Sequence, residues 1–363
     1  MPVVMQQGSS GRSFSLLPGV HCVPFARATR RDDVEIGIVN NMPDAALEST
    51  ERQFIGLLAT ASEKTPVRVR LFSLPGIPRG EVARRYVESQ YADIGELWNT
   101  QLDGLIVTGT EPRDALTAEP YWPAFTRLVD WAERNTASTV WSCLAAHAAV
   151  LHLDGVDRQA LANKCFGIFQ CERILNHPLM STLATLLQVP HSRWNDLPES
   201  ALAACGYGML SRSPEIGADM FVKDFGSLFV FLQGHPEYEA ATLLREYRRD
   251  VGRFLRGERK RYPAQPQRYF DQATAQALDV FRTQALADRS EGLLENFPAT
   301  SLRDLLINSG RASAVRFYRN WLACIAARRE ASATLRVAAS AFTSQTSPLP
   351  YRRDRRGGGA RGL

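Results

Sequence analysis

The segment from residue 138 to residue 150 constrains the fold of this chain more than any other. A short run of β-branched and aromatic residues, 138–142, leads directly into Cys143 and then into an Ala/Leu-rich stretch of helical character. A buried strand that turns into a helix through one residue is typical of a nucleophile elbow, which exposes that residue at the carboxyl edge of a sheet. Backbone N–H groups and the helix dipole would then face the sulfur and lower the pKa of the thiol. An isolated cysteine at such a junction is more often a packing residue, so a catalytic function requires a base and an orienting group nearby.

Strands and helices alternate along the first half of the chain. The expected strands are 34–40, 67–72, 105–109 and 138–142, and the expected helices between them include 47–58 and 121–134. This alternation predicts an α/β fold, a mostly parallel sheet flanked by helices with right-handed crossovers. Because ligands of such sheets bind at the carboxyl ends of the strands, the Thr108-Gly109 turn and Cys143 are expected at one site. Shorter strands and loops are expected over 160–230, and a long amphipathic helix over 240–255.

A histidine follows a second buried strand, at 227–232. It belongs to the sequence Gly234-His235-Pro236-Glu237, which the fold can bring to the same edge as Cys143. His235 there can accept the thiol proton and later deprotonate an incoming nucleophile. Glu237 can hold the imidazole in the required tautomer, as in a Cys-His-acid triad. The order of strand, cysteine, helix and distant histidine therefore favours catalysis over packing.

Composition excludes several other classes of protein. The chain has 363 residues, 45% hydrophobic and 22% charged, with no apolar run of about 20 residues and no secretory signal, so we expect a cytoplasmic protein without membrane contact. Six scattered cysteines without a C-x-x-C pair argue against structural zinc, and no metal is expected. Much of the net charge of +5 lies in an Arg/Gly-rich tail, where disorder is expected and nucleic-acid binding is not.

Several ordered blocks of the sequence resemble one family. The chain is similar to the homoserine O-acyltransferase (homoserine O-succinyltransferase) family of methionine biosynthesis, which has the class I glutamine amidotransferase-like fold. The similar blocks are 38–43, 50–54, 103–109, 121–123, 138–143, 164–167, 190–193, 234–238 and 249–250, with 320–322 similar to the terminal helix of the family.

The resemblance implies roles for individual residues. It makes Cys143 the acyl-accepting nucleophile, His235 the base and Glu237 the orienting acid, with the Leu144 N–H and a donor within 42–47 forming the oxyanion hole. The remaining implied site residues bind substrate, line its pocket or select the acyl group: Lys164, His191, Ser192, Arg193, Arg249, Thr110, Glu111 and Arg113.

The chemistry implied by the resemblance is ping-pong acyl transfer with no bound cofactor. Succinyl-CoA or acetyl-CoA would acylate Cys143, and the hydroxyl of homoserine or a related hydroxy amino acid would take the acyl group. In the family a glutamate in the 109–114 loop disfavours succinyl. Glu111 does not align cleanly with it and Arg113 can pair with a succinyl carboxylate, so succinyl is slightly favoured. Three alternatives stay open: a serine O-acyltransferase-type paralogue, a glutamine amidotransferase-like hydrolase and a non-catalytic ligand-binding paralogue.

The expected organisation has four parts. Residues 1–32 form an N-terminal arm, 33–258 the amidotransferase-like acyltransferase domain, 259–341 a helical segment packed on it, and 342–363 a disordered basic tail. Residues 271–305 are an insertion relative to the family, and the segment after Met42-Pro43 lacks the lysine that the family carries there. The family resemblance also implies a homodimer.

Overall fold

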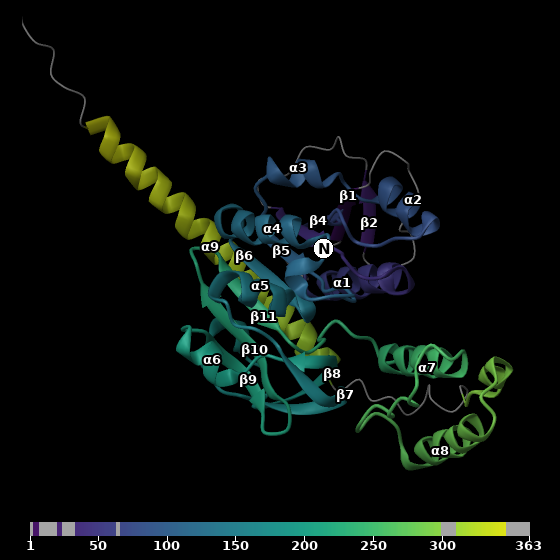
Figure 1. The fold of residues 1–363 in the computed structure, drawn as a ribbon. Coiled ribbons are helices and arrows are strands. Elements are labelled where there is room, and N and C mark those ends of the chain that lie inside the picture. Colours follow the sequence, from purple (N-terminus) through teal and green to yellow (C-terminus); the bar gives the residue numbers. More distant parts are fainter. Residues whose placement is uncertain (1–2, 7–19, 24–32, 63–65, 299–309, 346–363) are drawn as a thin grey trace, which may run out of the picture.

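The computed structural model describes residues 3–6, 20–23, 33–62, 66–298 and 310–345. An eleven-stranded sheet runs through these residues in the order β2-β1-β4-β3-β5-β6-β11-β10-β9-β7-β8 (Figure 1). Its strands are β1 (Val3–Gln6), β2 (Val20–Val23), β3 (Val34–Val39), β4 (Val67–Phe72), β5 (Gly104–Val107), β6 (Ser138–Ser142), β7 (Gln159–Arg173), β8 (Leu186–Asp196), β9 (Gly208–Ser213), β10 (Gly217–Asp224) and β11 (Leu228–Leu232).

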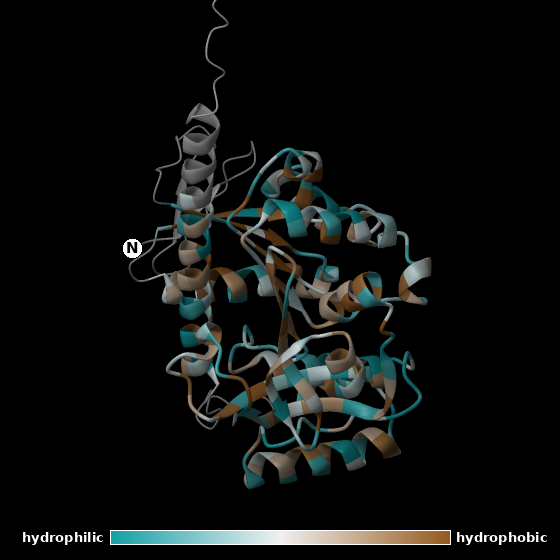
Figure 2. Cartoon of the chain, turned by 90° about the vertical axis from the view of Figure 1, so that its left-hand side faces the viewer, coloured by the Kyte–Doolittle hydropathy of each residue, from teal (hydrophilic) through white to brown (hydrophobic). Residues whose placement is uncertain are grey.

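The first half of the sheet is parallel. Every neighbouring pair from β2 to β11 runs parallel, which confirms the expected α/β fold. Buried strands without polar alternation form this half because helices cover both faces. Apolar residues of α1 and α9 pack on one face and those of α4 and α5 on the other, and Figure 2 shows the apolar strands between these layers. The helices of this half are α1 (Leu47–Ala61), α2 (Glu81–Gln90), α3 (Ile94–Trp98), α4 (Trp122–Asn135), α5 (Leu144–Asp154) and α9 (Arg311–Gln345).

The second half of the sheet is antiparallel. β11 pairs with β10, β10 with β9, β9 with β7, and β7 with β8, each pair antiparallel. The expectation of short strands over 160–230 is wrong for β7 and β8, which have 15 and 11 residues. Buried and exposed residues mix along both strands, so their sequences contain no continuous apolar run that would reveal their length.

Helices after the sheet form a third apolar cluster. It joins α7 (Thr242–Leu255), α8 (Gln272–Ala287) and the 3-10 helix η4 (Glu291–Asn296), and includes Phe166 of β7. Helices within 271–330 are thus confirmed, and Figure 1 shows α7 and α8 side by side. The short helix α6 (Glu199–Ala204) and the 3-10 turns η1 (Asp44–Ala46), η2 (Leu116–Ala118) and η3 (Pro178–Met180) complete the described elements.

Both ends of the described chain differ from expectation. The segment 1–32, expected as an extended arm, contributes β1 and β2 to the sheet. A disordered tail was expected from residue 342, but α9 extends to Gln345; residues 346–363 lie outside the described residues. Among the helices described, none is long and apolar enough to cross a membrane.

Candidate active site

Cys143 occupies a strained turn between β6 and α5. Its backbone has φ 53° and ψ −113°, a conformation that costs a non-glycine residue of the order of 1–3 kcal/mol. Its N–H donates to the Leu232 carbonyl oxygen at 2.7 Å, which ties the turn to the end of β11. The first N–H groups of α5 have no carbonyl within the helix to bind, so they and the helix dipole face the sulfur. The expected nucleophile elbow is confirmed as a backbone arrangement.

His235 and Glu237 lie on the turn that follows β11. The His235 Nδ1 atom is 2.8 Å from Glu237 Oε1, and Cys143 lies close enough to the imidazole to influence its pKa. Burial disfavours the imidazolium, but the neighbouring Cys143 and Glu237 charges outweigh it and hold the pKa of His235 well above its usual value. The surroundings of His235 therefore favour its imidazolium form, supported by the Glu237 carboxylate.

An aromatic ring packs against the His235 imidazole. The Tyr238 ring stacks on His235 with centroids 4.2 Å apart and an interplanar angle of 19°, and the Tyr238 hydroxyl donates to Glu246 of α7. On the other side the His235 N–H donates to the Pro190 carbonyl oxygen of β8 at 2.8 Å. The imidazole is therefore positioned by α7 and β8, elements that the position of His235 in the sequence does not reveal.

The Leu144 N–H, which was expected to form part of an oxyanion hole, lies beside the turn that follows β5. A Cβ atom added to Gly109, in the turn after β5, would lie 3.0 Å from the Leu144 nitrogen, so this turn passes directly beside that N–H. Within the 42–47 segment, the Met42, Ala46 and Leu47 N–H groups already donate to Asn40, Pro43 and Asp44 respectively. The Thr108-Gly109 turn was expected at one site with Cys143, and a glycine at the end of a buried strand is a signal for close backbone approach.

Three expected substrate-binding residues meet at two carboxylates of α7, one of which also binds the Tyr238 hydroxyl. Lys164 of β7 has its Nζ 3.3 Å from Asp250 Oδ2 and 3.5 Å from Glu246 Oε2. The Ser192 hydroxyl donates to Glu246, and the Arg249 guanidinium contacts Asp250 Oδ1 at 3.1 Å. Glu246 and Asp250, which the sequence analysis did not single out, organise this cluster from one face of α7. The arrangement offers cationic, hydroxyl and carboxylate groups together, as a zwitterionic substrate requires.

Arg193 was also expected to bind substrate, but its guanidinium is buried and bonded to other groups of the protein. It is 3% exposed, and its guanidinium donates to the Asn195 and Ile216 carbonyl oxygens at 2.7 and 2.6 Å and to Asp196 Oδ1 at 2.9 Å. Its Nε also donates to His191 Nδ1 at 3.4 Å, and His191 is fully buried. The structure places both residues beneath the site rather than at its surface.

The expected acyl-selectivity loop contacts α7. The exposed Glu111 binds Arg253 of α7 in a bidentate ion pair with distances of 3.1 and 3.3 Å. Partial burial raises the pKa of Glu111, but the Arg253 guanidinium lowers it more, and the net direction is down. Thr110 is half-buried and the Arg113 side chain is exposed, while the Arg113 backbone N–H binds Glu119.

A further cation lies near the nucleophile. Arg158 is half-buried between α5 and β7, close enough to Cys143 for the two charges to interact. Burial lowers the pKa of the Arg158 guanidinium, and the negative charges of Tyr121, Asp157 and Cys143 oppose that shift. No pattern in the sequence indicated this residue, because its neighbours Asp157 and Gln159 are exposed and polar.

Comparison of the sequence with known proteins identifies its family. A sequence model described as homoserine O-succinyltransferase matches residues 18–331. The chain belongs to the homoserine O-succinyltransferase family. It is 50% identical over 307 residues to homoserine O-succinyltransferase of Rhodopseudomonas palustris, covering 84% of this chain and 92% of that one. It is 47% identical over 296 residues to that of Methylorubrum extorquens, covering 81% and 88%. This membership makes the chain a transferase and confirms the family resemblance.

Solved structures with similar architecture are more distant in sequence. A glutamine amidotransferase from Methylobacillus flagellatus has a TM-score of 0.46 at 17% identity, over 82% of this chain and 95% of that one. A glutamine amidotransferase from Thermotoga maritima has a TM-score of 0.42 at 11% identity, over 80% and 97%.

Proposed function

We propose that this enzyme transfers a succinyl group from succinyl-CoA to the hydroxyl of homoserine, in methionine biosynthesis, through an acyl-cysteine at Cys143. The observation that carries the proposal is the Cys143–His235–Glu237 triad at the carboxyl edge of the sheet, in a chain of this family. No bound cofactor is needed, because the thiolate and the imidazole supply the nucleophile and the proton transfers.

The first half-reaction acylates the enzyme. The Cys143 thiolate attacks the thioester carbonyl, and the oxyanion that forms accepts a hydrogen bond from the Leu144 N–H. The Gly109 turn is the nearest source of a second backbone donor. When the tetrahedral intermediate collapses, the bond to CoA breaks and the His235 imidazolium can protonate the departing thiolate. The acyl group remains on Cys143 as a thioester.

The second half-reaction discharges the enzyme. Neutral His235 takes the proton of the substrate hydroxyl, whose oxygen attacks the acyl-cysteine and restores the thiolate. Arg249 is suited to the amino acid carboxylate, because its side chain is 38% exposed and only one of its sides contacts Asp250. Lys164 and Ser192 line the same cluster. The acceptor would thereby be held with its hydroxyl toward His235.

The acyl pocket favours succinyl over acetyl. The ion pair with Arg253 neutralises the Glu111 carboxylate, which would otherwise repel the terminal carboxylate of a succinyl group. Arg113 is exposed in the same loop and free to approach that carboxylate. Acetyl-CoA has no charge for these cations to bind. We place this activity in the cytoplasm and propose a homodimer as the working form.

Intact-mass spectrometry after incubation with each acyl-CoA tests the proposal. Succinyl-CoA should add one succinyl group to the wild type and none to Cys143→Ala, and acetyl-CoA should acylate weakly. Homoserine should then remove the adduct faster than serine does, which separates the enzyme from a serine O-acyltransferase. Absence of any adduct with both donors would contradict the mechanism. Release of ammonia from glutamine would instead support the hydrolase alternative.

A further inference from the structure

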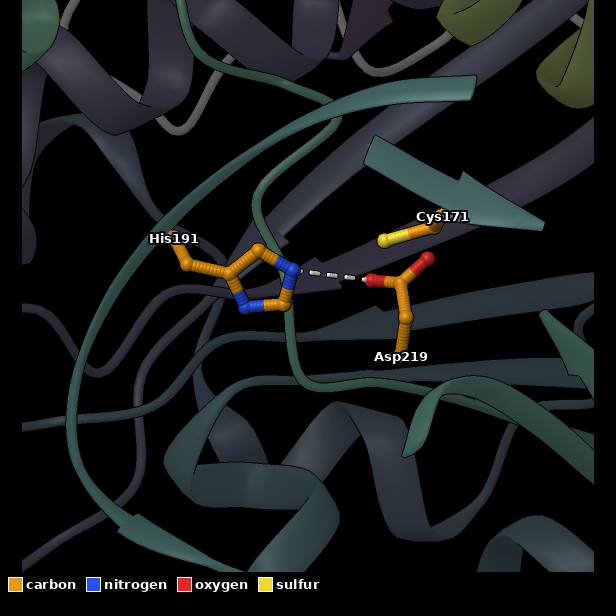
Figure 3. A group of neighbouring side chains, drawn as sticks. All are labelled: Cys171, His191 and Asp219. Carbon is orange, nitrogen blue, oxygen red and sulfur yellow. Dashed lines mark ion pairs between the residues drawn. The ribbon is translucent and has the colours of Figure 1, made fainter. Parts of the chain in front are cut away.

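A fully buried polar group lies directly beneath the turn that carries the base. Figure 3 shows Cys171 of β7, His191 of β8 and Asp219 of β10, with the His191 Nε2 and Asp219 Oδ1 atoms 3.2 Å apart. Both side chains of this pair are 0% exposed, and apart from this ion-pair contact neither facing atom has a hydrogen-bond partner among the described residues. The Ser211 hydroxyl donates to the second oxygen of Asp219 at 2.7 Å. A buried carboxylate and imidazole are costly to desolvate, so their presence requires an explanation.

The protonation of this group argues against a metal site. Because the Arg193 Nε–H donates to His191 Nδ1, the proton of a neutral His191 lies on Nε2, the atom that faces Asp219. A metal ligand would need a free lone pair on Nε2 and an acceptor, not a guanidinium, at Nδ1. Burial also raises the pKa of the Cys171 thiol, so its sulfur is protonated as well. The geometry therefore fits an imidazole that accepts a hydrogen bond from Arg193 and directs its Nε2 atom toward the Asp219 carboxylate.

Asp219 is directed into this position by an irregularity of its strand. Ala218 pairs with Arg212 and Met220 pairs with Ser211, so Asp219 has no partner of its own in β9 and forms a β-bulge. Bulges re-aim side chains and are frequent beside active sites. Since β10 and β8 are separated by β9 and β7 in the sheet, contact between Asp219 and His191 links two strands that the ladder does not join.

These two strands also hold the backbone that carries the base. The Gln233 N–H donates to the Asp219 carbonyl oxygen at 2.9 Å, and the His235 N–H donates to the Pro190 carbonyl oxygen at 2.8 Å. Between them, a Cβ atom on Gly234 would lie 2.7 Å from Asp219 Oδ1 and 2.8 Å from His191 Nε2. The turn thus rests directly on the buried pair.

We propose that His191 and Asp219 are positioning residues that fix the Gly234–His235 turn and so hold the base against Cys143. The pair sets the separation of β8 and β10, and each strand contributes one hydrogen bond to the turn. A change in that separation would move the His235 imidazole relative to the sulfur. The inference rests on the proposed function only in naming His235 as the base.

The pH dependence of Cys143 alkylation by iodoacetamide, followed on the peptide containing Cys143, tests the pair without any substrate. Asp219→Asn and His191→Leu should lower the rate constant at pH 7 roughly tenfold, because a displaced imidazole no longer stabilises the thiolate. His191→Gln, which keeps an N–H near the position of Nε2, should recover part of that loss.

The matched control is Asp33→Asn, which weakens a buried pair with Arg68 far from the site. It should lower the melting temperature and leave the alkylation profile unchanged. If Asp219→Asn does not fold, Ser211→Ala and His191→Gln test the same buried group, because each removes only one contact of Asp219 or His191. Variants of the pair that lose melting temperature but alkylate like the wild type would overturn the proposal.

Two further measurements separate this inference from its alternatives. With succinyl-CoA, Asp219→Asn should lower kcat by about 10- to 100-fold with KM within about twofold, as misplacement of a catalytic group does. If the wild type forms no acyl-enzyme, the proposed function fails while the alkylation profile still decides the role of the pair. Stoichiometric metal in the purified wild type that both Asp219→Asn and His191→Gln lose would show a metal site instead.

Discussion

The proposed nucleophile and the proposed base of this enzyme are held by regions of opposite character. Cys143 lies at the end of a parallel strand, and its geometry comes from the local passage of β6 into α5. His235 lies where the parallel half of the sheet meets the antiparallel half, and its backbone and ring are fixed by β8 and α7. The position of the Cys143 sulfur is therefore set by neighbouring residues in the chain, whereas the position of the His235 imidazole depends on contacts between distant segments.

Removal of the sulfur should give the largest effect on activity. Cys143→Ala should abolish transfer, a loss of at least about 10⁴-fold in kcat, because no other group can carry the acyl chain. The free energy of unfolding should change by less than about 1 kcal/mol, since the strained turn is retained. Steady-state kinetics and urea unfolding check both values. Residual acyl transfer at the wild-type rate would show that Cys143 is not the nucleophile.

Neutralisation of the orienting acid should be nearly as damaging. Glu237→Gln keeps the size of the side chain but removes a charge that raises the pKa of His235, so we expect a loss of about 10²- to 10⁴-fold in kcat. A lower imidazolium pKa also means that the thiolate–imidazolium pair is lost at lower pH. The alkaline limb of kcat/KM should therefore move to lower pH. An unmoved limb would contradict the assigned electrostatic role.

A methyl group at the Gly109 turn tests the nucleophile side alone. Gly109→Ala would place a Cβ 2.8 Å from the Leu144 Cβ and 3.0 Å from its nitrogen, which forces the turn and the oxyanion donor apart. We expect kcat to fall about 10²-fold, in the range found for loss of one oxyanion donor. Gly257→Ala, at a position with φ 84° and open space around it, is a control for general loss of stability.

Truncation of Arg249 tests binding of the acyl acceptor separately from reaction with the acyl donor. Arg249→Ala should raise KM for homoserine at least about tenfold, because a charge-assisted pair with the carboxylate is lost. The rate of Cys143 acylation should stay within about twofold, since Arg249 acts in the second half-reaction. Single-turnover acylation followed by discharge with homoserine measures both. An equal loss in the two steps would place Arg249 elsewhere in the mechanism.

The smallest effect is expected at the exposed ion pair between Glu111 and Arg253. Arg253→Gln would leave the Glu111 carboxylate without its partner, so KM for succinyl-CoA should rise a few-fold, as for an exposed charge pair. The double variant Arg253→Gln/Glu111→Gln should restore the wild-type value. An unchanged KM in the single variant would exclude this loop from contact with the succinyl carboxylate.

The sequence by itself determined strands β3 to β6 and β11 of the parallel half and singled out the three residues of the proposed triad. Buried strands covered on both faces leave continuous apolar runs, and a cysteine between such a run and a helix has few possible conformations. It did not determine the lengths of β7 and β8, whose mixed burial hides them, or the strand contribution of the 1–32 segment.

Only the tertiary structure decided which polar residues lie in the proposed substrate-binding cluster and which lie buried beneath the turn that carries His235. His191, Ser192 and Arg193 lie in one short block of the sequence. Alternation along β8 directs the His191 and Arg193 side chains into the interior and leaves Ser192 in contact with Glu246. Glu246 and Asp219 gave no signal in the sequence, because their roles arise from helix packing and from a bulge. Such placement depends on contacts between residues far apart in the chain, which local patterns do not encode.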